Sequence, residues 1–223
     1  MVKVFSGYSE DMAINPNNLN KIFVAGQAMS GSKYIPAIHK TTDGGNNWTK
    51  RNLISKSGSA YSVTIDPVNN NIIYAGGGEW ENYKSILYKS LNGGNDWTKI
   101  GGNITGYIYD IAVDPVSPSK VYAATSSGVY KSTNSGASWT KTSLSGSINC
   151  IKVYPKNPKI VFAGGRYGVH YSNDRGNTWV EANKGLAVPD VKCLDWNLKK
   201  RIIYAGTYGG SVYWNKKLLK KIK

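Results

Sequence analysis

Residues 107–145 read YIYDIAVDPVSPSKVYAATSSGVYKSTNSGASWTKTSLS, and this stretch decides the fold. It contains four short runs of alternating apolar and polar residues, YIYDIAV, KVYAAT, GVYKS and SWTKTS, each bounded by Pro, Gly, Asn or Ser. Short alternating runs between such turn-forming residues predict β-strands. The stretch therefore predicts one sheet of four antiparallel strands.

The same pattern recurs along the whole chain of 223 residues. The motif Ser/Thr-x-Asp/Asn-x-Gly-x-x-Trp occurs four times, and its tryptophans lie 49, 42 and 40 residues apart. A second element reads DMAINP, SVTIDP, DIAVDP and CIKVYP, with a degraded copy DVKCLD, and a third reads KIFVAG, NIIYAG, KVYAAT, KIVFAG and RIIYAG. Repeats of this length with four strands each are typical of β-propeller blades.

We therefore expect an all-β protein, a five-bladed β-propeller of four-stranded antiparallel blades that forms a single domain over residues 1–223. The repeats span approximately residues 6–55, 56–104, 105–145, 146–185 and 186–223. The fifth repeat stops before its fourth strand, and Val2, Lys3, Val4 and Phe5 fall where that strand belongs. We predict that this N-terminal strand completes the last blade and closes the ring, which would remove the open sheet edges.

The four tryptophan motifs resemble Asp boxes, also called BNR repeats, which occur in sialidases, xyloglucanase-like glycoside hydrolases, sortilin-type receptors and photosystem II assembly factors. The run from VDP through VYAAT to GVYKSTNSGASW is most similar to the xyloglucanase-like and assembly-factor group. The resemblance implies a turn between the third and fourth strands, in which Asp or Asn binds backbone N–H groups, Gly adopts a positive φ and Trp packs between blades. The structural Asp-box residues are then Asp43, Gly45, Trp48, Asn92, Gly94, Trp97, Asn134, Gly136, Trp139, Asp174, Gly176 and Trp179.

Composition narrows the possible classes of protein. The 12% of aromatic residues disfavours disorder, and no apolar stretch approaches the roughly 20 residues of a transmembrane helix. The N-terminus lacks the apolar core of a signal peptide. The compartment stays open, because the protein is either cytoplasmic or exported with its leader removed.

The chain is strongly basic, with a net charge of +15 from 24 Lys and four Arg against 13 acidic residues. Such a charge favours attraction to anionic surfaces, whereas the scarcity of Arg argues against specific nucleic-acid readout. The tail NKKLLKKIK is either a final strand or loop, or a short amphipathic helix on a membrane or partner. Six lysines occupy equivalent repeat positions, which we expect on outer strands where they discourage aggregation: Lys40, Lys89, Lys131, Lys50, Lys99 and Lys141.

The two cysteines and the possible metal ligands give no sign of special chemistry. Cys150 and Cys193 lie on the first strands of adjacent blades, and alignment on DVKCLD places them three repeat positions apart. We expect them to point to opposite sides of their sheets, without a disulfide. No residues lie at metal-ligand spacing. We therefore predict no metal and no cofactor, and no catalytic residue carries over from the enzymes.

The loops that join second to third strands are the least uniform part of the sequence. Propeller ligands usually meet these loops, on the face opposite the Asp boxes. Four of the five repeats place an aromatic residue there, and exposed aromatic side chains on loops indicate recognition. Alternatively, the rings plug the top of the central channel. The candidate ligand-binding residues are Trp80, Glu79, Glu81, Tyr83, Tyr34, Arg166, Tyr167 and Tyr208, which Tyr8, Tyr61, Tyr107 and Tyr109 could join.

Three functions fit these features. The first, which we favour, is a non-catalytic module that binds a glycan or a protein partner through the aromatic loops. The second is a structural or assembly component of a surface layer, virion or filament, or an assembly chaperone. The third is a glycoside hydrolase that uses Glu79 and Glu81. These two carboxylates lie two residues apart on one loop, whereas hydrolysis needs carboxylates that face each other across the sugar.

Overall fold

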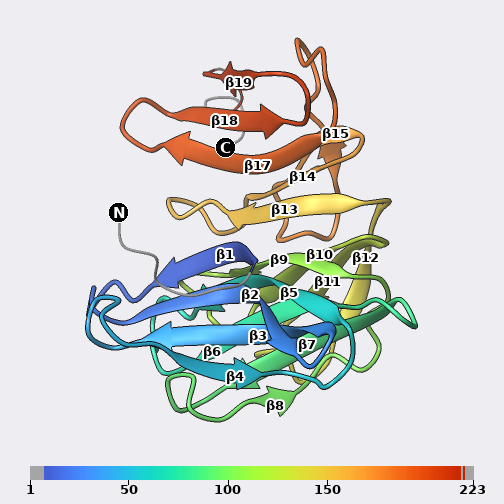
Figure 1. Cartoon of the computed structure of the whole chain (residues 1–223). Helices are drawn as coiled ribbons and strands as arrows, with labels where there is room; N and C mark the ends of the chain where they lie inside the picture. The colour runs from blue at the N-terminus through green and yellow to red at the C-terminus, as the bar shows by residue number, and fades with distance from the viewer. Residues whose placement is uncertain (1–7, 217, 219–223) are drawn as a thin grey trace.

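The computed structural model describes residues 8–216 and 218, and the 19 strands in this part of the chain form five antiparallel sheets (Figure 1). The first sheet contains β1 (Ser9–Ile14), β2 (Ile22–Ser30), β3 (Lys33–Thr41) and β4 (Thr49–Asn52). The second contains β5 (Gly58–Ile65), β6 (Ile73–Glu79), β7 (Lys84–Ser90) and β8 (Thr98–Lys99). The third contains β9 (Ile108–Val113), β10 (Val121–Thr125), β11 (Gly128–Ser132) and β12 (Thr140–Ser145). The fourth contains β13 (Ile148–Val153), β14 (Val161–Gly165), β15 (Gly168–Ser172) and β16 (Val180–Glu181), and the fifth contains β17 (Val191–Asn197), β18 (Ile202–Thr207) and β19 (Val212–Asn215).

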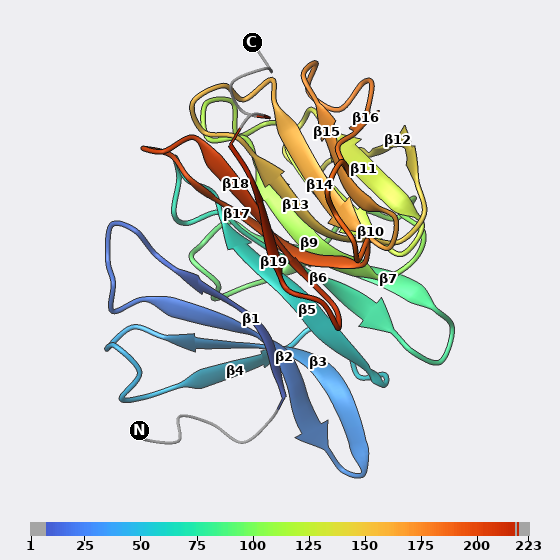
Figure 2. The same ribbon diagram turned by 90° about the horizontal axis from the view of Figure 1, so that it is seen from above.

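Within each sheet the strands lie in the order of the sequence, and the five first strands pack against one another in succession. β1, β5, β9, β13 and β17 therefore follow one another toward the middle of the molecule, and the later strands of each sheet lie further out (Figure 2). The expected all-β architecture of antiparallel sheets is confirmed, and the five sheets fit the five expected blades.

The structure does not show closure of the ring. Residues 2–5, the expected closing strand, lie outside the described residues, and so does the basic tail apart from residues 215, 216 and 218. The described part of the fifth sheet has three strands. On the first blade, Met12 is 58% exposed, whereas its counterparts Val63, Ile111, Ile151 and Leu194 are at most 3% exposed because the preceding blade covers them. Closure by the N-terminal strand stays a prediction.

Aromatic side chains on the second strands hold neighbouring blades together. Phe23, Tyr74 and Tyr122 are fully buried, and each lies against the Asp-box glycine of the following blade. At Gly94 the approach is so close that a Cβ would lie 2.5 Å from Phe23 Cε1. Gly94 also has a φ of +81°, so a side chain would be strained as well as obstructed. Glycine therefore serves both the turn and the packing of the blades.

The Asp-box turns share one hydrogen-bond pattern. In the third blade, Ser132 Oγ accepts a hydrogen bond from Gly136 N at 2.8 Å, and Asn134 Oδ1 accepts one from Ser138 N at 2.8 Å. Trp139 is 4% exposed, and its Nε1 donates to Gly136 O at 3.0 Å, a bond that Trp48 repeats and that Trp97 and Trp179 do not make. The side chains thus satisfy backbone groups that a tight turn leaves without partners. Asp43 makes equivalent bonds in the first blade, and these hold its pKa down at about 2.

Three of the six repeated lysines differ from the expectation. Lys40, Lys89 and Lys131 lie on the third strands, inside the sheets, and each reaches the Asp-box turn of the following blade. Lys40 Nζ lies 2.7 Å from Asn95 Oδ1, Lys89 Nζ 2.8 Å from Ser135 O, and Lys131 Nζ 3.0 Å from Asn177 Oδ1. They therefore link blades. Only the other three lie on the fourth strands as expected: Lys50, Lys99 and Lys141.

The expected placement of the two cysteines is wrong. Cys150 pairs with Gly164 and Cys193 pairs with Gly206, at the same position of the two sheets. They therefore occupy equivalent positions, with each sulfur beside its paired glycine. The correct copy of the second element in the last repeat is CLDWNL, three residues further on than DVKCLD, and it lacks the proline that marks the other copies. Both thiols are free.

Candidate functional site

The candidate residues gather at the end of the sheets opposite the Asp boxes. Neighbouring strands are antiparallel, so loops between second and third strands lie at the other end of each sheet from turns between third and fourth strands. At the Asp-box end, repeated side chains link one blade to the next. The opposite end carries side chains that differ from blade to blade.

Five aromatic side chains of the second and third blades form one group, which we call the aromatic cluster: Trp80, Tyr61, Tyr83, Tyr107 and Tyr109. Trp80 Nε1 donates a hydrogen bond to the Tyr61 hydroxyl at 3.0 Å. The ring centroids of Tyr61 and Tyr109 lie 5.6 Å apart, and those of Tyr83 and Tyr107 are stacked at 5.9 Å. Trp80 is 37% exposed and Tyr83 is 77% exposed. The cluster is therefore ordered by its own contacts, yet open to a ligand.

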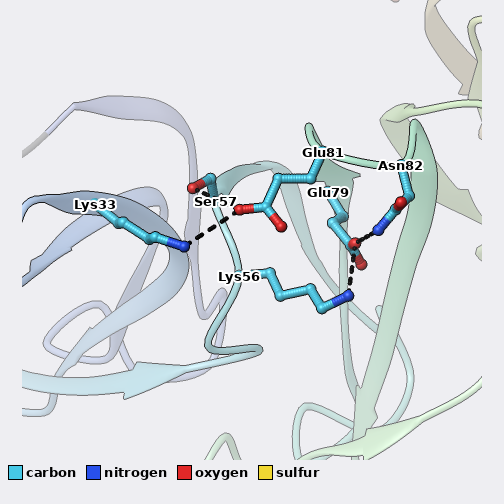
Figure 3. Close-up of polar contacts among 6 residues, drawn as sticks. All are labelled: Lys33, Lys56, Ser57, Glu79, Glu81 and Asn82. Carbon is cyan, nitrogen blue, oxygen red and sulfur yellow. Dashed lines mark hydrogen bonds and ion pairs between the residues drawn. The ribbon is translucent and has the colours of Figure 1, made fainter.

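The two acidic residues that flank Trp80 are held in separate ion pairs (Figure 3). Glu79 Oε1 accepts from Lys56 Nζ at 3.2 Å and from Asn82 Nδ2 at 2.5 Å. Glu81 Oε1 lies 3.4 Å from Lys33 Nζ of the first blade and 3.4 Å from Ser57 Oγ. The Asn82 hydrogen bond, followed by Lys56, lowers the pKa of Glu79. These contacts fix the loop on which Trp80 stands.

The remaining aromatic candidates lie apart from the aromatic cluster. Tyr34 packs edge-on against Tyr8 in the first blade, with ring centroids 5.6 Å apart. Tyr167, on the hairpin between β14 and β15, is 64% exposed. Tyr208 is 72% exposed, and Lys192 Nζ lies 5.3 Å from its ring centroid. The rim of this face therefore carries exposed rings on several blades, with the densest group on the second and third.

Each first strand contains a β-bulge at the same place. The pairing register skips one residue there in all five sheets, and the skipped residues are Glu10, Tyr61, Tyr109, Asn149 and Lys192. A bulge leaves one residue without a ladder partner and turns its side chain in a new direction. In this protein the five skipped residues all line one cavity.

This axial cavity has a volume of about 660 Å³ and takes lining residues from every blade. The hairpin between β14 and β15 contributes Arg166, a residue that the sequence had indicated. The complete lining is Glu10, Tyr61, Tyr109, Ser147, Asn149, Arg166, Asp190 and Lys192. Sequence reasoning missed five of these: Glu10, Ser147, Asn149, Asp190 and Lys192. A signal was present, because four of the bulged residues stand six positions before the Pro of the second element, and this position holds three residue types in four repeats.

The axial cavity holds two basic and two acidic side chains, and one basic and one acidic side chain form an ion pair. Asp190 pairs with Lys192 Nζ at 3.1 Å and accepts a hydrogen bond from Asn149 Nδ2 at 3.1 Å. Burial raises the pKa values of Tyr61 and Tyr109, so both hydroxyls stay protonated at neutral pH.

No group of three His, Cys, Asp or Glu residues suited to a metal ion occurs among residues 8–216 and 218. The described residues also include no helix long and apolar enough to cross a membrane.

Comparisons with known proteins support the fold. No family model matches the chain, and no curated protein does. An ancestral GH74 enzyme superposes with a TM-score of 0.65 at 20% identity, covering 93% of this chain and 32% of that chain. A GH74 enzyme from Niastella koreensis gives 0.54 at 13% identity, covering 93% and 46%. Sqt1 from Chaetomium thermophilum gives 0.57 at 13% identity, covering 96% and 70%.

This chain thus spans about a third of the ancestral GH74 enzyme and less than half of the enzyme from Niastella koreensis. The similarity is one of propeller fold, consistent with the resemblance to Asp-box repeats.

Proposed function

We propose that this protein is a non-catalytic recognition module that binds a glycan or a protein partner through the face opposite the Asp boxes. The aromatic cluster is the observation that supports this proposal. Its rings are fixed by contacts of 5.6 to 6.1 Å and one 3.0 Å hydrogen bond, while Tyr83 remains 77% exposed. Rigid aromatic side chains provide large contact area at little entropic cost, which is why they dominate binding sites.

The state of the two glutamates supports binding without hydrolysis. A glycoside hydrolase needs one carboxylic acid that keeps its proton near neutral pH, which requires a raised pKa. The pKa of Glu79 is lowered instead, and its carboxylate is occupied by Asn82 and Lys56. Glu81 is engaged by Lys33 and Ser57. Both groups are therefore placed to hold the loop rather than to transfer protons to a substrate.

Binding to a broad glycan array tests the proposal. We expect saturable binding by the wild-type protein, loss of that binding in Trp80→Ala, and retention in Trp214→Ala. Trp214 is the matched control because it is 64% exposed on β19, outside the aromatic cluster. If no glycan binds, a pull-down from the native source tests for a protein partner with the wild-type protein and Trp80→Ala. Equal binding by Trp80→Ala and the wild type would exclude the aromatic cluster. Sugar release that is lost in Glu79→Gln would replace recognition with hydrolysis.

A structural or assembly role is a second proposal, supported by the two ends of the blade series. Met12 and Ile14 are 58% and 45% exposed on the first blade, and Val212 and Trp214 are 66% and 64% exposed on the last. The positions equivalent to Met12 and Val212 hold buried apolar side chains in the other blades, so the exposed surfaces at the two ends can bind other subunits. Light scattering over a range of protein concentrations tests it. A mass that stays that of one chain would contradict self-assembly.

A further inference from the structure

We infer that the axial cavity is a distinct binding site for a sugar that carries a carboxylate group, such as a hexuronate residue. The inference rests on the proposed glycan recognition, because it names the class of sugar and the place where it binds. The cavity is separate from the exposed edge of the aromatic cluster at Tyr83, although Tyr61 and Tyr109 contribute to both.

The five β-bulges bring side chains from all five sheets to one place. A regular first strand would keep its residues in the ladder, with side chains against the neighbouring blades. The bulge instead directs one side chain per blade into a common space of about 660 Å³, and this happens in all five sheets. Small-molecule sites in proteins commonly fall between about 300 and 1,000 Å³. The cavity can therefore hold one or two sugar rings.

Two of the four charged side chains that line the axial cavity form an ion pair with each other. Lys192 and Asp190 neutralise each other at 3.1 Å. Arg166 and Glu10, in contrast, form no ion pair among residues 8–216 and 218, with each other or with any other group. Both are exposed residues that line the cavity, one from the fourth blade and one from the first. The site therefore offers a free guanidinium on one side and a free carboxylate on another.

The side chains that line the axial cavity match the chemical groups of an acidic sugar. A guanidinium binds a carboxylate through two parallel hydrogen bonds, which makes Arg166 the anchor for an acidic group. Glu10 would repel such a group, but it can accept hydrogen bonds from hydroxyl groups. Asn149 Nδ2 already donates to Asp190 and Val191 O, so Asn149 offers its Oδ1 as an acceptor. Ser147 and the two tyrosine hydroxyls add donors and acceptors, which suits sugar hydroxyls because each hydroxyl both donates and accepts. The rings of Tyr61 and Tyr109 provide flat apolar surface for the C–H face of a sugar.

Isothermal titration calorimetry tests this inference with galacturonate and glucuronate, their neutral parents galactose and glucose, and short oligouronides. We expect the acidic sugars to bind more tightly than the neutral ones. Arg166→Gln should weaken binding of the acidic sugars at least about tenfold, because a hydrogen-bonded charge is lost. The same variant should weaken binding of neutral sugars much less, because the charge of the guanidinium acts on the carboxylate alone. The matched control is Arg51→Gln, which removes the same charge from β4, an outer strand.

Two variants locate the site more sharply. Glu10→Gln removes the charge that opposes the carboxylate, so we expect equal or tighter binding of acidic sugars. Tyr109→Phe keeps the ring and should retain most of the affinity. Circular dichroism of each variant confirms folding.

Four results would overturn the inference. Equal binding of acidic and neutral sugars would refute the carboxylate preference but leave the proposed glycan recognition intact. Unchanged binding by Arg166→Gln would exclude Arg166 as the anchor. Binding of peptides with an acidic C-terminus in place of any sugar, lost in Arg166→Gln, would keep the cavity as a site but replace its ligand class. If Trp80→Ala abolishes glycan binding while Arg166→Gln has no effect on it, the proposed function stands and the axial site falls.

Discussion

Ser135 O accepts two hydrogen bonds from the preceding blade, and this shared carbonyl makes a specific prediction about stability. Tyr74 Oη donates to it at 3.1 Å and Lys89 Nζ at 2.8 Å. Tyr74 is fully buried, and burial raises its pKa to about 12, so the hydroxyl keeps its proton. We expect Tyr74→Phe to lower the free energy of unfolding by about 1 kcal/mol, the usual net value of one hydrogen bond. The same change should lower Tm by about 2–4 °C in a chain of this size.

Lys89→Met should cost a similar amount, about 1 kcal/mol, because the side chain is only half-buried and water weakens its contribution. Either single variant leaves Ser135 O with one donor. The double variant leaves it with none among the described residues, which adds a desolvation cost of about 1 kcal/mol for a half-buried carbonyl. The double variant should therefore be less stable than the sum of the single effects predicts. Phe keeps the ring at position 74, so the 5.3 Å contact between Lys89 Nζ and that ring does not complicate the cycle.

Urea denaturation of the wild type, the two single variants and the double variant measures the coupling energy between Tyr74 and Lys89. The measurement requires that the unfolding free energy depends equally steeply on urea concentration in all four proteins. The chain offers a matched control cycle, Tyr122→Phe with Lys131→Met. Tyr122 Oη donates to Arg175 O at 3.2 Å, whereas Lys131 Nζ donates to Asn177 Oδ1 at 3.0 Å, so no acceptor is shared. The control cycle should be additive within about 0.5 kcal/mol. If the Tyr74 and Lys89 cycle is equally additive, the shared carbonyl does not couple the two residues and the reasoning fails.

Two further predictions concern titratable groups. Burial raises the pKa of Asp110 to about 6, above its value of about 3.9 in an unfolded chain. Its contribution to stability is therefore full below about pH 4 and falls as the pH rises through about 6. Asp110→Asn keeps an acceptor for Ile151 N and should flatten this part of the stability profile, measured by urea midpoints from pH 4 to 8; an unchanged profile would contradict it. Cys193 is exposed, whereas Cys150 is 4% exposed and burial raises its pKa. Mass spectrometry should find one maleimide label on the native protein and two in urea, and rapid double labelling of the native protein would show that Cys150 is accessible.

Local signals made the sheets predictable. Proline and glycine bound the strands of each repeat, and the Trp motif marks the same turn four times, so the five sheets follow from spacing alone. The last repeat shows the limit of that method. Its second element lacks proline, and alignment on DVKCLD misplaces Cys193 by three residues. Pairing with Gly206 in the sheet, which no local pattern encodes, sets the true position.

The candidate site was only partly predictable for a related reason. The sequence indicates Trp80 and Arg166 because variable loops with aromatic or basic residues stand out in a uniform repeat. It does not reveal that Glu81 meets Lys33 of another blade, since that contact depends on how two sheets pack. Nor does it reveal the β-bulges, because one skipped residue in a strand leaves composition and alternation almost unchanged. Such a residue is found only from the register of the pairing.

Equivalent positions of the five repeats, each of which forms a column when the repeats are aligned, fall into two groups. The residues of one group contact the next blade, and those of the other line the axial cavity. Where the residues are alike, as in the second-strand aromatics Phe23, Tyr74 and Tyr122, each side chain packs against the next blade. The bulged column, in contrast, holds four different residue types, in Glu10, Tyr61, Tyr109, Asn149 and Lys192, and its members line the axial cavity. If these residues served only to hold the blades together, one residue type would serve in every blade, because the surrounding backbone repeats. A column with four residue types among five blades on a repeating backbone suits a ligand that is itself asymmetric, and it is the column in which substitutions should change binding while leaving the fold intact.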